Sequence, residues 1–343
     1  MKCYISACHC KIVFMKIAII KLSSLGDIIH TMVVLQFIKK LRTNIKIDWI
    51  VEEKFKEVLE NNPDINKIHT VNFQEVKKTK SFKLFFLELS KIKEFGNYDI
   101  VIDFQGLFKT AVVSKFLSSK GIVGFDWHSV RESFSSLIYN QKVKIGYDKN
   151  TIVRYVKLTS KALDIEITLD DLNSKDPYLF YRSTVLIPET PYIVLVVGST
   201  WKSRNYPKEK FIQVANTLKQ RCVVIWGTEE ERQKSEWMAL QSNYITVMPK
   251  LSLDELKYVI SNSSLIIGND TGPSHMSWAM NIPSIILFGP TPPERMFQTN
   301  KNLFIKSNSK INHWKLDKND FSIKEIVVDD IVKMAKKLIN ITS

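Results

Sequence analysis

Residues 16–31 read KIAIIKLSSLGDIIHT. The first six form a short apolar run typical of a buried β-strand, and from residue 28 to residue 41 apolar side chains recur at helical spacing. Small and hydroxyl-bearing residues join the two segments. The order strand, loop, helix predicts one unit of a parallel sheet that helices cover on both faces.

The same alternation runs along most of the chain. Further strands are predicted at residues 46–51, 67–71, 98–103 and 121–124, and a helix at residues 81–95. After a polar stretch at residues 164–177 the pattern begins again. It predicts strands at residues 192–197, 221–226, 244–247, 264–268 and 284–288, and helices at residues 207–220, 229–242, 252–262 and 274–280.

These elements predict an α/β fold of two Rossmann-like lobes with a cleft between them. We expect the N-terminal lobe over residues 15–175, the C-terminal lobe over residues 190–320 and a closing helix over residues 323–339. Ligands of open parallel sheets bind beyond the carboxyl ends of the strands, so the functional site is expected in the cleft.

Composition and charge narrow the class of protein. The 343 residues, 45% of them hydrophobic and 24% charged, are enough for two well-filled soluble domains. The uncharged residues 271–293 contain five prolines, which excludes a membrane-spanning helix there. The N-terminus shows no secretory signal pattern, so we expect a cytoplasmic protein. The net charge of +14 predicts an anionic partner, which can be nucleic acid, an acidic membrane surface or a phosphorylated small molecule.

Residues 1–14 differ from the rest of the chain. They hold Cys3, Cys8 and Cys10, three of the four cysteines, and end just before Met15, where the first strand begins. We interpret them as a non-native or disordered leader, with Met15 as the natural start. Only Cys222 then remains, and no disulfide is expected.

The loop after the first strand contains the first candidate site residue, Asp27. Backbone amides at the start of a helix keep a carboxylate ionised, and an ionised carboxylate can accept a proton from a substrate hydroxyl. The alternative is that Asp27 only caps the helix at residues 28–41. The spacing leaves both roles open, and the loop matches neither the dinucleotide-binding fingerprint nor the P-loop.

The segment GNDTGPSH at residues 268–275 again joins a strand to a helix. Gly268 and Gly272 free the turn, and the amides of a helix N-terminus are suited to a diphosphate. The alternative is a plain turn in which Asp270 or Thr271 caps the helix. His275 taken alone is more typical of a packed histidine than of a ligand.

Two loops of the second lobe carry further candidates. In the segment GSTWKSRNYP at residues 198–207, the cations Lys202 and Arg204 can clamp a phosphate or form a solvated basic loop. In the segment WGTEEE at residues 226–231, the carboxylates can hold ribose hydroxyls or simply favour the start of a helix.

Residues 77–93 combine lysines with apolar residues. A helical wheel places an apolar group opposite a group of lysines, namely Phe82, Phe85, Phe86, Leu89 and Ile92 against Lys80, Lys83 and Lys91. An ordinary surface helix and a surface that docks on anionic lipid both fit this pattern.

The chain contains no Asp-x-Asp pair, a motif that could bridge a metal ion to a diphosphate. The charge on a leaving diphosphate would then be neutralised by Lys, Arg and helix amides. We therefore expect no obligatory metal ion and no cofactor.

Four ordered segments together resemble one known family. They are KLSSLGDIIHT at residues 21–31, DFQGLFKT at 103–110, GFDWHSVRE at 124–132 and GNDTGPSH at 268–275. They are similar to the ADP-heptose:lipopolysaccharide heptosyltransferases, and the likeness runs from Met15 to the C-terminal helix. Shorter segments, VEEKF at residues 51–55 and MPKLSL at residues 248–253, agree with it.

The resemblance implies a glycosyltransferase-B fold and an inverting transfer of L-glycero-D-manno-heptose from ADP-heptose to the inner Kdo of Kdo2-lipid A. Asp27 would be the base that deprotonates the acceptor hydroxyl. Such an enzyme would lie on the inner face of the inner membrane, held peripherally by its anionic surface, and would bind no nucleic acid.

The resemblance also assigns binding residues to each lobe. The donor residues would be Ser199, Thr200, Lys202, Arg204, Glu230, Leu251, Asp270, Thr271, Gly272 and His275. The acceptor or cleft residues would be Lys21, Ser23, Ser24, Gly26, Asp103, Gln105, Gly106, Lys109 and Arg131. The family commonly has Lys where this chain has Arg204, so either Lys202 or Arg204 would hold the diphosphate. The ribose carboxylate would be one of the glutamates at 229–231.

Two alternative functions stay open. A related heptosyltransferase that adds a later core sugar would share the fold, although the S-S-x-G-D spelling favours the enzyme that adds the first heptose. A non-catalytic basic protein that binds membrane or nucleic acid would explain the charge, although the sequence contains no recognisable nucleic-acid-binding module.

Overall fold

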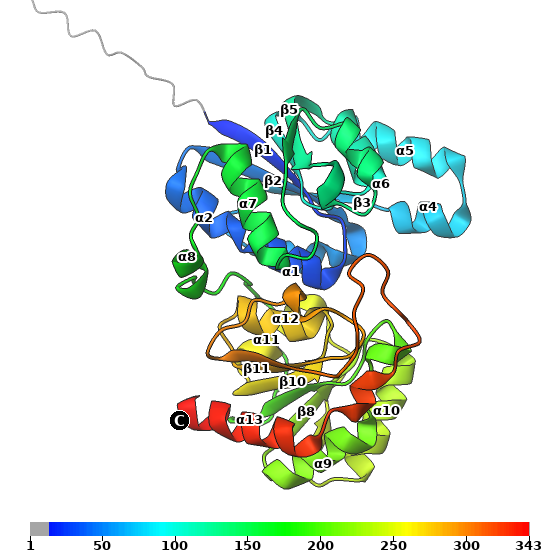
Figure 1. Ribbon diagram of the computed structural model, residues 1–343, viewed down its shortest axis with the longest axis vertical. Coiled ribbons are helices and arrows are strands. Elements are labelled where there is room, and N and C mark those ends of the chain that lie inside the picture. The colour runs from blue at the N-terminus through cyan, green and yellow to red at the C-terminus, as the bar shows by residue number, and fades with distance from the viewer. Residues whose placement is uncertain (1–13, 343) are drawn as a thin grey trace, which may run out of the picture.

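The computed structural model describes residues 14–342, and the side chains of residues 14–339. It consists of two α/β lobes stacked along the long axis of the molecule (Figure 1). This arrangement confirms the predicted fold class. Apart from Phe14, the predicted leader lies outside the described residues.

The sheet of the N-terminal lobe is parallel and has the strand order β3-β2-β1-β4-β5-β6. Its strands are β1 (Met15–Ile20), β2 (Ile45–Glu52), β3 (Lys67–Val71), β4 (Asn97–Asp103), β5 (Ser118–Phe125) and β6 (Gln141–Val143). Ile17 and Ile19 of β1 pack into one core cluster and Ala18 and Ile20 into another, because successive side chains point to opposite faces of a sheet. Both faces are therefore covered by helices.

The helices of this lobe connect the strands and fill those two faces. They are α1 (Leu25–Met32), α2 (Val34–Leu41), α3 (Lys56–Leu59), α4 (Phe73–Thr79), α5 (Phe82–Lys93), α6 (Phe108–Phe116), α7 (Thr151–Leu163) and α8 (Leu169–Asn173). Helices α4 and α5 extend away from the lobe as a pair (Figure 1).

The sheet of the C-terminal lobe is also parallel, with the strand order β12-β11-β10-β7-β8-β9. Its strands are β7 (Ile193–Val196), β8 (Cys222–Ile225), β9 (Ile245–Val247), β10 (Leu265–Asn269), β11 (Ser284–Phe288) and β12 (Asn302–Lys306). Its helices are α9 (Lys208–Leu218), α10 (Glu229–Leu240), α11 (Leu253–Ser261), α12 (Gly272–Ala279) and α13 (Val328–Thr342).

The two sheets have the same topology. Counted within each lobe, the strand order is 3-2-1-4-5-6, so the connections leave in opposite directions from the first and fourth strands. A ligand site is expected outside the carboxyl ends of the two strands at such a switch point. In this molecule those strands are β1 and β4 in one lobe, and β7 and β10 in the other.

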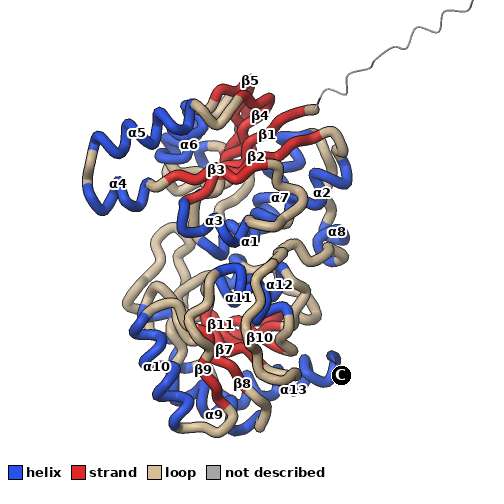
Figure 2. The backbone as a smooth tube through the Cα atoms, turned by 180° about the vertical axis from the view of Figure 1, so that it is seen from behind, coloured by secondary structure: helices blue, strands red, loops and turns tan. Residues whose placement is uncertain are grey.

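The lobes meet through helices that belong to one face of each sheet. Helices α1 and α3 lie against α11 and α12 between the two sheets (Figure 2). One core cluster continues across this boundary, since it contains Ile29 of α1 together with Met276 of α12. The carboxyl ends of the central strands of both sheets therefore border the same cleft.

Several predicted elements have different bounds in the structure. The helix expected at 28–41 is two helices separated at Val33, and the first of them begins at Leu25. The apolar spacing continues through the break, so periodicity alone could not show it. The closing helix begins at Val328 instead of residue 323, because Ser322–Glu325 form a separate 3₁₀ turn. The short edge strands β6 and β12 were not predicted.

Candidate active site between the lobes

Asp27 lies in the first turn of α1, directly beyond the carboxyl end of β1. The N-cap of this helix is Ser24 and not Asp27. The Ser24 hydroxyl donates a 2.8 Å hydrogen bond to Asp27 Oδ2, and the Ser24 amide donates a second one of 3.3 Å. Asp27 is the third residue of α1 and stabilises the start of the helix through one of its two carboxylate oxygens.

The charges around Asp27 keep it ionised. Burial by itself raises the pKa of the Asp27 carboxyl, but the positive charges of Lys21 and Arg295 and the hydrogen bond from Ser24 outweigh that effect, so the pKa lies below its ordinary value. At neutral pH the group is a carboxylate and can accept a proton.

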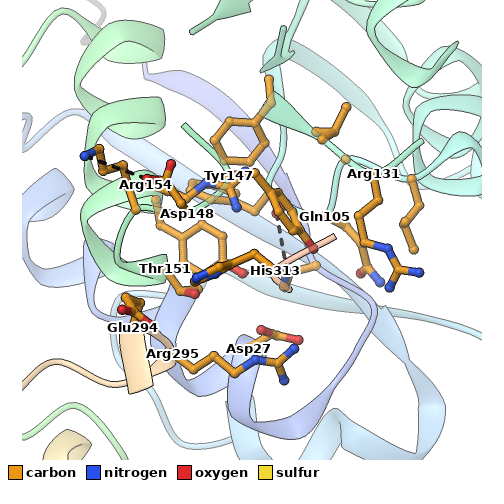
Figure 3. Close-up of a pocket in the computed structure, with 18 of the residues that line it drawn as sticks. Asp27, Gln105, Arg131, Tyr147, Asp148, Thr151, Arg154, Glu294, Arg295 and His313 are labelled. Atoms are coloured by element: carbon orange, nitrogen blue, oxygen red, sulfur yellow. Dashed lines mark hydrogen bonds and ion pairs between the residues drawn. The ribbon is translucent and has the colours of Figure 1, made fainter. Parts of the chain in front are cut away.

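A polar pocket opens beside Asp27, and we call it the acceptor pocket after the ligand that the sequence analysis predicts for its residues (Figure 3). Most of its wall belongs to the N-terminal lobe, and a smaller part comes from the loops after β11 and β12. The predicted residues that line it are Lys21, Ser23, Asp27, Gln105, Gly106 and Arg131. Arg154 and Arg295 also line it, although neither was predicted as a site residue. Its five lysines and arginines exceed its three carboxylates, Asp27, Asp148 and Glu294, so the pocket is positively charged on balance and suits an anionic ligand.

Two of these cations are held in place by the N-terminal lobe. Lys21 Nζ donates a 2.7 Å hydrogen bond to the Tyr155 hydroxyl and a 3.3 Å bond to the Phe104 carbonyl. Arg154 is 9% exposed, and one of its terminal nitrogens donates to the Ser129 carbonyl at 2.5 Å. Its Nε has no partner among the described residues. A buried unpaired donor is costly, so an anion in the pocket would stabilise this arrangement.

The loop after β4 is anchored from below by Asp103. This residue is fully buried and accepts hydrogen bonds from the Tyr139 hydroxyl at 2.7 Å and from the amides of Gln105 and Gly106 at 2.9 and 3.2 Å. Asp103 was predicted to line the cleft. In the structure it is buried beneath the loop and shapes it instead. Lys109 does not line the acceptor pocket either, and its Nζ lies 4.0 Å from Glu52 Oε1.

The starts of α1 and α12 touch each other across the lobe boundary. A Cβ on Gly272 would lie 2.5 Å from Leu25 Cδ2, and a Cβ on Gly26 would lie 2.9 Å from His275 Cδ2. Such distances leave no room for a side chain at either glycine. A junction pocket at this contact is lined from both lobes by Ser23, Ser24, Gly26, Asp27, Thr200, Arg204, Asp270, Thr271, Gly272, His275 and Arg295.

A buried network supports the C-terminal side of this junction. His275 Nε2 and Asp270 Oδ1 are 2.9 Å apart, and Arg204 Nη1 donates to Asp270 Oδ2 at 3.3 Å. The His275 ring also meets His30 edge to face, with centroids 4.5 Å apart. Thr271, the N-cap of α12, gives the helix no side-chain hydrogen bond. Pro273 has no backbone N–H, so the amides of Gly272 and Ser274 are the donors at the start of α12 that remain available to an anionic ligand.

A third pocket, which we call the nucleotide pocket after its predicted ligand, lies in the C-terminal lobe beyond β7, β8 and β10. The predicted donor residues that line it are Ser199, Thr200, Lys202, Glu230, Leu251 and Thr271. Trp226 and Trp237 add aromatic surface. The structure thus divides the predicted donor residues, because Arg204, Asp270, Gly272 and His275 line the junction pocket and not this one.

The structure distinguishes candidate binding residues that the sequence left as alternatives. Arg204 is paired with Asp270, whereas Lys202 is exposed at the edge of the nucleotide pocket. Glu231 accepts hydrogen bonds from the amides of Gly227 and Thr228 at 2.7 and 3.2 Å, and Glu229 pairs with Arg232 at 2.6 Å. Glu230 lines the pocket and takes part in neither contact.

Comparison with known proteins places this arrangement in a family. Residues 90–324 match the model of glycosyltransferase family 9 (heptosyltransferase). The chain belongs to this family. A lipopolysaccharide heptosyltransferase 1 from Campylobacter coli is 40% identical, and the match covers 94% of this chain and 99% of the relative. The enzyme of the same name from Escherichia coli K12 is 28% identical over 85% of this chain and 93% of the relative.

Solved structures agree with the fold of this family 9 glycosyltransferase. The Escherichia coli heptosyltransferase WaaC with ADP superposes with a TM-score of 0.79, at 23% identity, over 94% of this chain and all of the other. A glycosyltransferase of family 9 from Veillonella parvula gives a TM-score of 0.77 at 18% identity, over 95% of this chain and 97% of the other. Two Rossmann-like lobes around a cleft, as predicted, constitute the glycosyltransferase-B fold.

Sequence reasoning missed two arginines that the glycosyltransferase places in its acceptor pocket, Arg154 and Arg295. Arg154 sits in an amphipathic helix without any motif. Arg295 follows β11, and the rule that ligands bind beyond the carboxyl ends of strands could have identified it. Within the described residues no group of three or more His, Cys, Asp or Glu side chains could hold a metal ion, and no described helix is long and apolar enough to cross a membrane.

Proposed function

We propose that this enzyme transfers L-glycero-D-manno-heptose from ADP-heptose to the inner Kdo of Kdo2-lipid A, with inversion at the anomeric carbon and without a metal ion. The observation that carries the proposal is the position of Asp27. Its carboxylate borders both the cationic acceptor pocket and the junction pocket that faces the start of α12. A base is needed where an acceptor hydroxyl meets a donor sugar.

The proposed reaction is a single displacement. The acceptor oxygen forms a bond to the anomeric carbon of the heptose while its proton passes to the Asp27 carboxylate. The bond from that carbon to the β-phosphate oxygen breaks, and its electron pair leaves with ADP. The α12 amides and Lys202 stabilise the growing charge on the diphosphate, and Arg204 holds Asp270 in place beside them.

The charge of each pocket supports the assignment of its ligand. The acceptor pocket contains the cations Lys21, Arg131 and Arg154, which suit the carboxylates of Kdo. The nucleotide pocket combines aromatic surface with the carboxylate of Glu230, which suits a nucleoside with its ribose hydroxyls. Identity also favours the first heptose over a later one, since the match to a heptosyltransferase 3 from Escherichia coli is only 22%. Membership in an enzyme family leaves the non-catalytic alternative without support.

A product analysis tests the proposal directly. The enzyme is incubated with ADP-heptose and Kdo2-lipid A, and with other nucleotide sugars in parallel. We expect mass spectrometry to show one heptose added to the acceptor, and nuclear magnetic resonance to show an anomeric configuration opposite to that of the donor. Release of ADP without transfer, or retention of configuration, would contradict the proposal.

The membrane that carries the acceptor is the second part of the proposal. We expect peripheral attachment to the anionic inner face of the inner membrane through α4 and α5. The predicted apolar face is only partly buried, since Leu89 and Ile92 pack inside while Phe82 and Phe86 are 81% and 63% exposed. Helices α4 and α5 and the turn between them also carry exposed lysines, namely Lys77, Lys78, Lys80, Lys83, Lys91 and Lys93. Exposed aromatic rings beside lysines are typical of a surface that binds anionic lipid.

Vesicle flotation tests this surface. Replacing Phe82 and Phe86 together with Ser is expected to weaken binding to phosphatidylglycerol-containing vesicles by about tenfold or more, because each buried Phe contributes roughly 1.5–3 kcal/mol. Leu240→Ser is the matched control, since this exposed leucine lies on the C-terminal lobe. Equal binding of both variants, or equal binding to pure phosphatidylcholine vesicles, would argue against the proposed surface.

A further inference from the structure

Arg295 belongs to one lobe and lines a pocket of the other. It ends the 3₁₀ turn Pro293–Arg295, which follows β11 of the C-terminal lobe. Its side chain nevertheless extends to the acceptor pocket and toward Asp27 (Figure 3). It also lines the junction pocket, but it does not line the nucleotide pocket.

The guanidinium of Arg295 has no polar partner among the described residues. Arg204 pairs with Asp270, and Arg154 donates to a backbone carbonyl, whereas the Arg295 side chain forms no ion pair or side-chain hydrogen bond with any described residue. The positive charge of Arg295 lowers the pKa of both Asp27 and Asp270, yet Arg295 forms an ion pair with neither of them. A half-buried arginine without a partner, facing a pocket, is suited to an anionic ligand.

We infer that Arg295 is an acceptor-binding residue supplied by the donor lobe, and that its guanidinium holds an anionic group of the acceptor beside Asp27. The inference rests on the proposed function, in which the acceptor carries carboxylates. A guanidinium presents paired N–H groups that match the two oxygens of a carboxylate, which a lysine cannot do.

The geometry of the displacement explains why Arg295 is assigned to the acceptor and not to the diphosphate. In an inverting displacement the nucleophile and the leaving group lie on opposite sides of the anomeric carbon. Asp27 marks the side of the nucleophile, and Arg295 lines the acceptor pocket together with Asp27. Lys202 and Arg204, the cations assigned to the diphosphate side, do not line the acceptor pocket, whereas Arg295 does.

Steady-state kinetics and donor binding together test this inference. For Arg295→Gln we expect the KM for the acceptor to rise by about tenfold to a hundredfold, since a hydrogen bond to a charged group contributes roughly 1.5–3 kcal/mol. The Kd for ADP-heptose, measured without acceptor, should stay unchanged. Arg295→Lys keeps the charge and should recover only part of the loss. Arg182→Gln, an exposed arginine of the segment between the lobes, is the control.

A pH profile gives a readout that altered packing alone would not move. The positive charge of Arg295 lowers the pKa of Asp27. Its removal raises that pKa, so the acid limb of kcat/KM should move to higher pH in Arg295→Gln and stay in place in Arg295→Lys. Melting curves confirm that the variants are folded.

The possible outcomes separate the two claims. A raised Kd for ADP-heptose with an unchanged acceptor KM would overturn the inference and make Arg295 a diphosphate ligand. Unchanged values for both substrates would also overturn it. If the unmodified enzyme transfers no heptose to Kdo2-lipid A, it is the proposed function that fails.

Discussion

Replacing Asp27 with Asn is expected to lower kcat by about 10²–10⁴, the usual loss when a general base is removed. The amide has the shape of the carboxylate, and its oxygen can still accept both hydrogen bonds from Ser24 that start α1. The fold and the donor site should therefore survive. Single-turnover measurement of heptose transfer and calorimetric titration with ADP-heptose check the two halves of this expectation.

The control for this variant is Asp164→Asn, which changes an exposed carboxylate in the N-terminal lobe without touching the cleft. It should leave kcat unchanged. The pH dependence follows from the sign of the shift, since a base must be ionised and the pKa of Asp27 is lowered. Its protonation should cause no loss of rate between about pH 7 and pH 5. Retention of the full rate by the Asp27→Asn enzyme would end the role of this residue as base.

Replacing Asp270 with Ala is expected to lower the free energy of unfolding by about 3–5 kcal/mol, because it leaves the largely buried guanidinium of Arg204 without its counter-charge. It also removes the partner of His275, which packs against Gly26 at the lobe boundary. Urea denaturation followed by circular dichroism measures the loss.

The companion variants separate the ion pair from general damage. Asp270→Ala combined with Arg204→Met should recover part of the stability, since no unpaired charge then remains. Asp176→Ala removes an exposed carboxylate outside this network and should have little effect. A loss below about 1 kcal/mol for Asp270→Ala would contradict this prediction. It would mean that water or a shift of neighbouring groups solvates the guanidinium of Arg204 in place of the lost carboxylate.

The site could be predicted in part because its loops follow strands. Asp27 and the segment at 268–275 both come directly after apolar runs, and parallel strands deliver such loops to one edge of a sheet. The same rule could not tell a side chain that lines the cleft from one beneath it. Asp103 ends β4, at the same edge of the sheet beyond which Asp27 lies, yet three hydrogen bonds hold Asp103 under the loop that follows β4.

Hydrophobic periodicity predicted which residues form the apolar face of a helix, but not how much of that face other elements cover. Helix α5 has the spacing of an ordinary surface helix, and only the position of α4 and α5 beside the lobe leaves Phe82 and Phe86 open to solvent. Likewise, the two cations of the loop at residues 198–207 looked equivalent. The pairing of Arg204 with Asp270 made them different.

The sequence by itself determined the alternation of strands and helices, the division into two α/β lobes and the loops that carry the chemistry. These features depend on hydrophobic spacing and on residues near one another in the chain. Only the tertiary structure decided which charged groups meet. Asp27 and Arg295 are far apart in the sequence and belong to different lobes, and they face one pocket because α1 packs against α12. No local pattern records such a contact, since its energy depends on how two separately folded sheets are placed against each other.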